Sequence, residues 1–118
     1  MDQLTGRPRA RLTVDDRPGD GLVIELGGEL DIASLPDVTP RVDELLGSAP
    51  GPACLDLAEL GFLDSSGVTM LVRLANHFQP LRTVRVSEPV RRVIEVLGLR
   101  DRLGLDEGAD EAPDGVGA

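Results

Sequence analysis

Apolar and polar residues alternate at the start of the chain, and this pattern predicts a pair of strands. Ala10, Leu12 and Val14 lie on one face of such a strand, with polar residues between them. Residues 15–21 are rich in Asp, Gly and Pro and predict a turn, and the apolar run 22–26 predicts a second strand. We therefore expect an antiparallel hairpin with a long loop.

Three later segments repeat apolar residues at spacings of three and four, which marks one face of a helix. The first helix has two possible N-terminal caps, Ser34 and Thr39. Pro40 fits the first turn of a helix that Thr39 caps, but it would kink a helix that Ser34 caps. The apolar faces are formed by Leu35, Val38, Val42, Leu45 and Leu46, by Val68, Leu71, Val72, Ala75 and Phe78, and by Val90, Val93, Ile94 and Leu97.

The segments between these helices predict two further short strands. Residues 53–57 and 83–86 have the apolar pattern of strands, and residues 58–63 are predicted as a loop. Pro80 should end the second helix. Ser87 is followed by an early proline and should begin the third helix as its cap.

The order of these elements predicts an α/β fold. A hairpin followed by alternating helices and strands is typical of a small mixed β-sheet with helices packed on it. The length of 118 residues allows a single domain, which we place at residues 9–105. Residues 1–8 lack a pattern and predict a disordered leader. Residues 106–118 carry five acidic residues and no basic one, which predicts a disordered acidic tail.

The charge balance argues against nucleic acid and membrane partners. A formal net charge of −9 and a pI of about 4.4 favour repulsion from phosphate backbones and anionic lipids. The chain has no Trp or Tyr on which bases could stack, and no apolar run approaches the roughly 18 residues of a membrane span. The single cysteine, Cys54, cannot form an intrachain disulfide and is expected in the core. We therefore expect a soluble, cytoplasmic protein.

The most informative stretch is Asp64-Ser65-Ser66-Gly67, which lies where the second helix begins. A serine at this position can cap the helix, act as a nucleophile or accept a phosphate. The only histidine, His77, lies twelve residues after Ser65 on the same helix, about 18 Å away at about 1.5 Å per residue, so it cannot be the base that a nucleophile needs. One Cys and one His do not make a zinc site. Neither an enzyme nor a bound cofactor is expected.

The other two roles of the serines stay open on the local motif alone. A phosphoserine adds about −1.5 to −2 charges, and beside Asp64 it would repel an acidic or apolar partner surface. The N–H groups of the following helix could hold that phosphate. If Ser65 and Ser66 are caps, they bond to the same N–H groups instead. Arg91 and Arg92, a separate polar pair, are expected on a solvated helix face.

Four motifs in a fixed order resemble the STAS domain and, more narrowly, the stand-alone anti-sigma factor antagonists of bacteria. The resemblance extends over residues 9–105. The motifs are GELDIAS at residues 28–34, LDL at residues 55–57, FLDSSGV at residues 62–68, and PVRRV at residues 89–93 with the following LGL.

The resemblance implies a regulator and no enzyme. Members of this family bind a serine-kinase anti-sigma factor and free the sigma factor. The kinase then phosphorylates the serine after the aspartate, which breaks the complex, and a phosphoserine phosphatase restores it. That serine is Ser65 by position, and ATP belongs to the kinase. The implied partner-binding residues are Asp31, Ile32, Asp64, Ser65, Ser66, Gly67 and Val68. The alternative is a STAS-like sensor that binds a nucleotide or small anion at the helix N-terminus.

Overall fold

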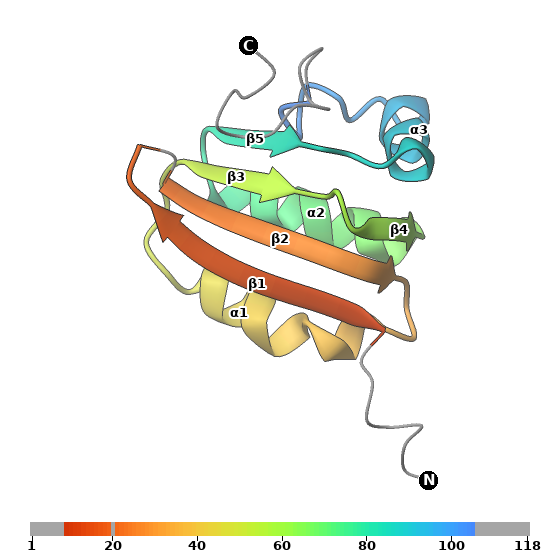
Figure 1. Ribbon diagram of the computed structural model, residues 1–118, viewed down its shortest axis with the longest axis horizontal. Coiled ribbons are helices and arrows are strands. Elements are labelled where there is room, and N and C mark those ends of the chain that lie inside the picture. Colours follow the sequence, from red (N-terminus) through yellow and green to blue (C-terminus); the bar gives the residue numbers. More distant parts are fainter. Residues whose placement is uncertain (1–8, 20, 106–118) are drawn as a thin grey trace, which may run out of the picture.

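The computed structural model describes residues 9–19 and 21–105, and these form one mixed sheet with helices packed on it (Figure 1). The predicted leader and acidic tail lie outside the described residues. The elements in chain order are β1 (Ala10–Arg17), β2 (Gly21–Leu30), the 3-10 helix η2 (Leu35–Asp37), α1 (Thr39–Leu46), β3 (Ala53–Asp56), β4 (Leu60–Leu63), α2 (Ser65–His77), β5 (Leu81–Val84) and α3 (Glu88–Val96).

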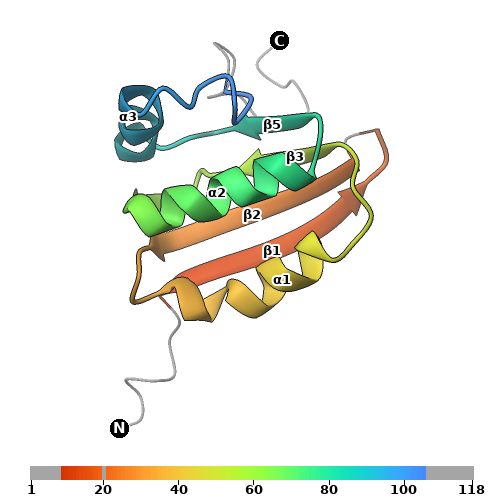
Figure 2. The same ribbon diagram turned by 180° about the vertical axis from the view of Figure 1, so that it is seen from behind.

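The sheet follows the order β1-β2-β3-β5, with β4 paired to β2 as well. Only the β1–β2 pair is antiparallel, and β2 pairs in parallel with both β3 and β4. Because β2 has 10 residues, its first half meets β3 and its last three residues meet β4. Helices α1 and α2 lie on the same face of this sheet (Figure 2). The predicted α/β class and mixed sheet are confirmed.

The core is aliphatic and lies between the sheet and these two helices. Alternate residues of the strands point toward the helices, so Ile24 of β2 lies beside Leu55 of β3 in register, and neither is exposed. Leu71 and Leu74 of α2 are equally buried against them. The period of about 3.6 residues that the sequence shows in this helix therefore marks the face that it buries.

The boundaries of several strands differ from those predicted. Strand β2, predicted to end at Leu26, continues to Leu30, because its last residues pair with β1 and β4. Strand β1 continues to Arg17, so the hairpin loop is short, because an edge strand tolerates charged residues such as Asp15 and Asp16. Residues 60–63, predicted as loop, form β4, which depends on a distant partner, the end of β2. The last short strand begins two residues early, at Leu81, and stops before Arg85, whose φ of 56° cannot continue a strand.

Helix beginnings were predicted better than their caps. Helix α1 begins at Thr39 with Pro40 in its first turn, yet the Thr39 hydroxyl donates to Leu35 O at 2.8 Å and caps nothing. The Ser34 hydroxyl donates to Glu29 O at 2.6 Å. Helix α3 follows Ser87 as predicted, but that hydroxyl donates to the carbonyl oxygen of Leu60. All three hydroxyls thus donate to backbone carbonyls and cap no helix, through local bonds for Ser34 and Thr39 and through a tertiary bond for Ser87.

None of the helices within the described part of the chain is long and apolar enough to cross a membrane.

Candidate functional site

Two segments that are distant in sequence meet at one end of the sheet. Strands β2 and β4 run parallel with Leu30 opposite Leu63, so the chain leaves both strands at the same end of the sheet (Figure 1). The backbone N–H of Asp64 donates to Leu30 O at 3.2 Å and ties the two exits together. The loop of residues 31–34 and the start of α2 therefore lie side by side, as the resemblance implied.

Asp64 is the cap of α2. Its backbone is extended, and its Oδ1 accepts hydrogen bonds from the N–H groups of Ser66 at 2.9 Å and Gly67 at 3.1 Å. Its Oδ2 accepts one from the N–H of Ile32 at 3.2 Å. The alternative that Ser65 and Ser66 cap the helix, which the sequence left open, is therefore excluded, because the aspartate that precedes them fills this role equally well.

The same hydrogen bonds set the charge of the site. The Ser66 hydroxyl, which donates to Asp64 at 2.6 Å, lowers the pKa of that carboxyl most, and the N–H groups of Gly67, Ile32 and Ser66 lower it further. The N–H of Ser34 does the same for the pKa of Asp31. Both carboxylates are therefore ionised at neutral pH.

The two serines differ in their surroundings. Ser66 is half-buried and its hydroxyl is engaged with Asp64. Ser65 is exposed, and within the described chain its hydroxyl has no hydrogen-bond partner. Its backbone carbonyl accepts a bond from Thr69 at 3.0 Å, which belongs to the helix. Ser65 is the serine that a second molecule can reach.

Two exposed apolar side chains lie on the segments that end at this site. Ile32 is 76% exposed on the loop after β2, and Phe62 is 50% exposed on β4. Phe62 is the first residue of the FLDSSGV motif, but it was not among the predicted site residues. The signal was there, since this is one of two Phe in the chain and stands two residues before Asp64.

Gly67 and Val68 lie in the interior. A Cβ on Gly67 would lie 2.3 Å from Leu30 O, so only glycine lets α2 pass this closely over the end of β2. Val68 is 8% exposed and belongs to the core. Of the seven predicted site residues, these two anchor the helix, whereas Asp31, Ile32, Asp64, Ser65 and Ser66 reach the surface to different extents.

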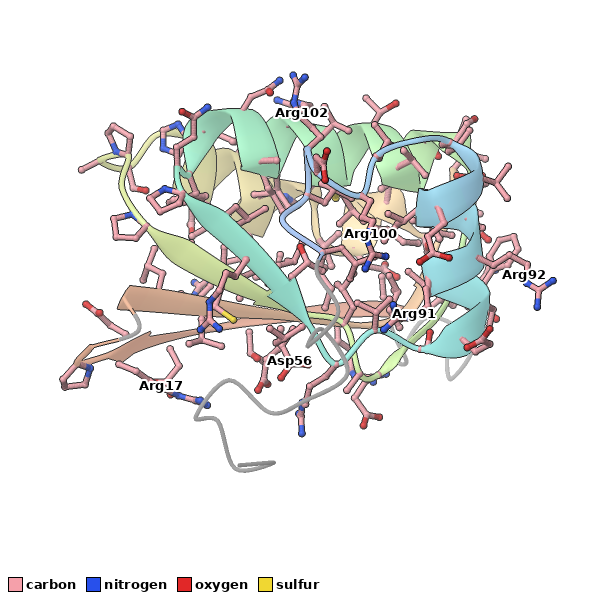
Figure 3. All side chains as sticks on the ribbon, turned by 90° about the horizontal axis from the view of Figure 1, so that it is seen from above. Arg17, Asp56, Arg91, Arg92, Arg100 and Arg102 are labelled. Carbon is pink, nitrogen blue, oxygen red and sulfur yellow. The ribbon has the colours of Figure 1, made fainter. Side chains whose placement is uncertain are left out.

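The remaining candidates lie elsewhere. His77 is the last residue of α2, and its ring lies 2.9 Å from Ser48 O. Cys54 is buried in β3, as predicted. Arg92 points away from the molecule, but Arg91 lies back against it with 16% of its side chain exposed (Figure 3), so the prediction of a solvated pair is wrong for Arg91.

The comparison with protein families agrees with this architecture. The sequence model of the family described as "Mlab, STAS domain" matches residues 13–105. The chain belongs to the STAS domain family.

Known relatives are regulators of sigma factors. The chain is similar to an anti-sigma-B factor antagonist of Staphylococcus epidermidis, with 25% identity over 91 residues, which cover 74% of this chain and 84% of the relative. An anti-sigma-B factor antagonist of Staphylococcus aureus is 24% identical over the same length, with the same shares covered.

Solved structures share the fold. An anti-sigma factor antagonist from Mycobacterium paratuberculosis superposes with a TM-score of 0.68 at 21% identity, covering 92% of this chain and 95% of that one. The phosphorylated form of the Bacillus protein SpoIIAA gives a TM-score of 0.55 at 19% identity, covering 77% and 86%. These likenesses define the fold and leave the activity to be argued from the site.

Proposed function

We propose that this chain is an anti-sigma factor antagonist that binds a serine-kinase anti-sigma factor and thereby frees the sigma factor. Phosphorylation of Ser65 ends the binding, and a phosphoserine phosphatase restores it. The observation that carries the proposal is the exposed Ser65 hydroxyl without a partner, directly after the capping carboxylate of Asp64. The likeness to anti-sigma-B factor antagonists supports the choice of partner.

The geometry gives a reason why a phosphate would act as a switch. The sequence suggested that the helix N–H groups could hold the phosphate, but the carboxylate of Asp64 already accepts the bonds of Ser66 and Gly67. A phosphate on Ser65 would add about −1.5 to −2 charges next to that carboxylate. The added charge would remain at the contact surface and repel an apolar or acidic partner face.

The contact surface in this proposal combines charge and apolar area. Ile32 supplies an exposed side chain on a loop that the Asp64 carboxylate fixes in place. Asp31 is fixed in turn by the N–H groups of Ala33 and Ser34, at 3.1 and 2.9 Å. A preorganised loop loses little conformational entropy on binding, which favours a protein partner.

The chemistry of the switch belongs to the partners. The kinase would supply ATP, magnesium and the phosphoryl-transfer residues, and the phosphatase would remove the phosphate in the cytoplasm. His77 lies at the far end of the 13-residue helix α2, so this histidine cannot serve Ser65 as a general base. We therefore propose a regulatory, non-enzymatic role.

The geometry does not favour the alternative of a nucleotide or anion sensor at the start of α2. Such a sensor needs unsatisfied N–H groups at the helix N-terminus. Here Asp64 takes the N–H groups of Ser66 and Gly67, and its own charge would repel an anion.

Capture and titration of the partner test the proposal. The full chain, tagged, would be used to isolate a protein kinase from native bacterial lysate, and the kinase would then be titrated with variants. We expect Ser65→Ala to bind like the unsubstituted chain and Ser65→Asp to bind at least about tenfold more weakly. Ala49→Asp, an exposed position after α1, controls for added charge alone. Equal binding of Ser65→Asp and the unsubstituted chain would contradict the switch.

A further inference from the structure

A pocket of about 300 Å³ opens on the face of the sheet opposite α1 and α2. The register aligns Thr13, Glu25 and Asp56 in one row across three strands, so their side chains share this face. Figure 3 shows Asp56 on the side of the sheet that faces away from α2. Arg11, Gly27, Glu59 and Arg85 line the pocket beside these three residues.

One wall of the pocket is a fixed ion pair. Asp56, which is 4% exposed, accepts a hydrogen bond on Oδ2 from Arg85 Nε at 3.0 Å, and Arg85 Nη2 lies 2.9 Å from the same oxygen in an ion pair. Its Oδ1 accepts one from the N–H of Ala58 at 3.0 Å. Arg85 has a φ of 56°, and in the described chain it is the one residue other than glycine with a positive φ. A strained backbone persists where its surroundings fix it, often at a binding site.

The opposite part of the pocket carries charges that do not pair with each other. Within the described residues, neither the Arg11 guanidinium nor the Glu59 carboxylate forms a hydrogen bond or an ion pair. Both side chains lie over Gly27, since a Cβ on it would lie 2.5 Å from Arg11 Nη2 and 3.0 Å from Glu59 Cβ. The carboxylate of Glu25 accepts one bond, from the Thr13 hydroxyl at 3.1 Å. The pocket thus presents unused donors and unused acceptors.

These charges limit the chemistry of a ligand. The lining contains two arginines and three carboxylates, so its net charge does not favour a simple anion. No three His, Cys, Asp or Glu side chains gather as a metal site requires, in residues 9–19 and 21–105. A ligand with one negative and one positive end matches both kinds of unused group.

We propose that this pocket binds a small zwitterion of the α-amino acid class. The carboxylate of the ligand pairs with the Arg11 guanidinium, and its ammonium group lies between Glu25 and Glu59. The Asp56–Arg85 pair forms the rigid wall, and the absence of a side chain on Gly27 leaves room for Arg11 and Glu59 to lie over it. The volume is at the lower end of the range of small-molecule pockets, which suits a ligand of this size. This site is separate from the Ser65 surface and does not depend on the function proposed for it.

Nuclear magnetic resonance titration of the full chain tests the proposal. Glycine, L-glutamine, L-glutamate and L-arginine would be added one at a time, with acetate and methylamine as probes that carry only one of the two charges. We expect at least one of the amino acids to cause saturable shifts of the backbone amides of Gly27, Glu59 and Arg85. Acetate and methylamine should not shift the signals of those amides.

Two variants assign the contacts. Arg11→Gln and Glu59→Gln replace exposed side chains and should each weaken the binding by about tenfold or more. Arg41→Gln, on α1 at the other face of the sheet, should leave it unchanged. The proposal is overturned if no amino acid causes saturable shifts, if acetate or methylamine alone reproduces them, or if the folded Arg11→Gln variant binds as tightly as the unsubstituted chain.

Discussion

Asp64 Oδ2 accepts a hydrogen bond from the backbone N–H of Ile32 at 3.2 Å, so the residue that caps α2 also fixes the loop after β2. One carboxylate therefore positions both halves of the candidate site. Its other oxygen accepts from Ser66 and Gly67. This double role gives Asp64 effects on stability and on binding that neighbouring side chains do not share.

Replacement of Asp64 by Asn should lower stability at neutral pH and weaken partner binding. The hydrogen bonds hold the folded-state pKa of Asp64 below its usual 3.8. The ionised form therefore stabilises the fold above about pH 4, and this contribution is lost as the pH falls through the lowered pKa. Melting temperatures should differ by a few degrees at neutral pH and converge in acid. Asp43→Asn, at an exposed position of α1, is the control. A difference in melting temperature between Asp64→Asn and the unsubstituted chain that stays constant with pH would contradict this account.

Ile32→Glu should weaken the kinase complex by about tenfold or more, because an apolar contact is exchanged for a charge without a partner. The fold should be unaffected, since the side chain is 76% exposed. Titration calorimetry measures the affinity, and circular dichroism checks the fold. Val96→Glu, at a similarly exposed aliphatic on α3, is the matched control. Unchanged affinity for Ile32→Glu would remove the loop from the interface.

Gly67→Ala should destabilise the protein by about 1–3 kcal/mol, as overpacking in a core does. The new methyl group would lie 2.3 Å from Leu30 O and would push α2 away from β2. At Gly47 a methyl group would approach no closer than 3.5 Å to Asp43 O, so Gly47→Ala should change stability little. Urea denaturation of both variants gives the comparison. Equal urea midpoints for Gly67→Ala and Gly47→Ala would contradict this prediction, because α2 would then move away from β2 without a loss of stability.

The sequence predicted best where a pattern is local and repeated. The apolar face of α2 follows from spacings of three and four, and the structure buries Leu71 and Leu74 on it. Prediction from the sequence failed where a residue distant in the chain determines the local structure. Strand β4 exists because residues 28–30 extend β2 far enough to pair with it. The Ser87 hydroxyl bonds across the fold to Leu60 O, whereas the Ser34 hydroxyl bonds back to Glu29 O, five residues earlier, and neither caps a helix.

The candidate site shows the same division. The meeting of Asp31 and Ile32 with the start of α2 was inferred from resemblance, and a parallel pair of strands brings it about. The capping role of Asp64 was missed because aspartate and serine cap equally well, and only the geometry separates them. The burial of Val68 follows from the periodic apolar face of this helix. The burial of Gly67 could not be predicted from periodicity, since it depends on how closely α2 crosses Leu30.

The most direct test of the central claim is the intact mass of two alanine variants after incubation with the cognate kinase and ATP. Ser65 is exposed with an unused hydroxyl, whereas the Ser66 hydroxyl is bound to Asp64. We therefore predict that Ser66→Ala gains one phosphate and that Ser65→Ala gains none while still binding the kinase. A phosphate on Ser65→Ala, or none on a folded Ser66→Ala, would contradict the assignment of Ser65 as the switch.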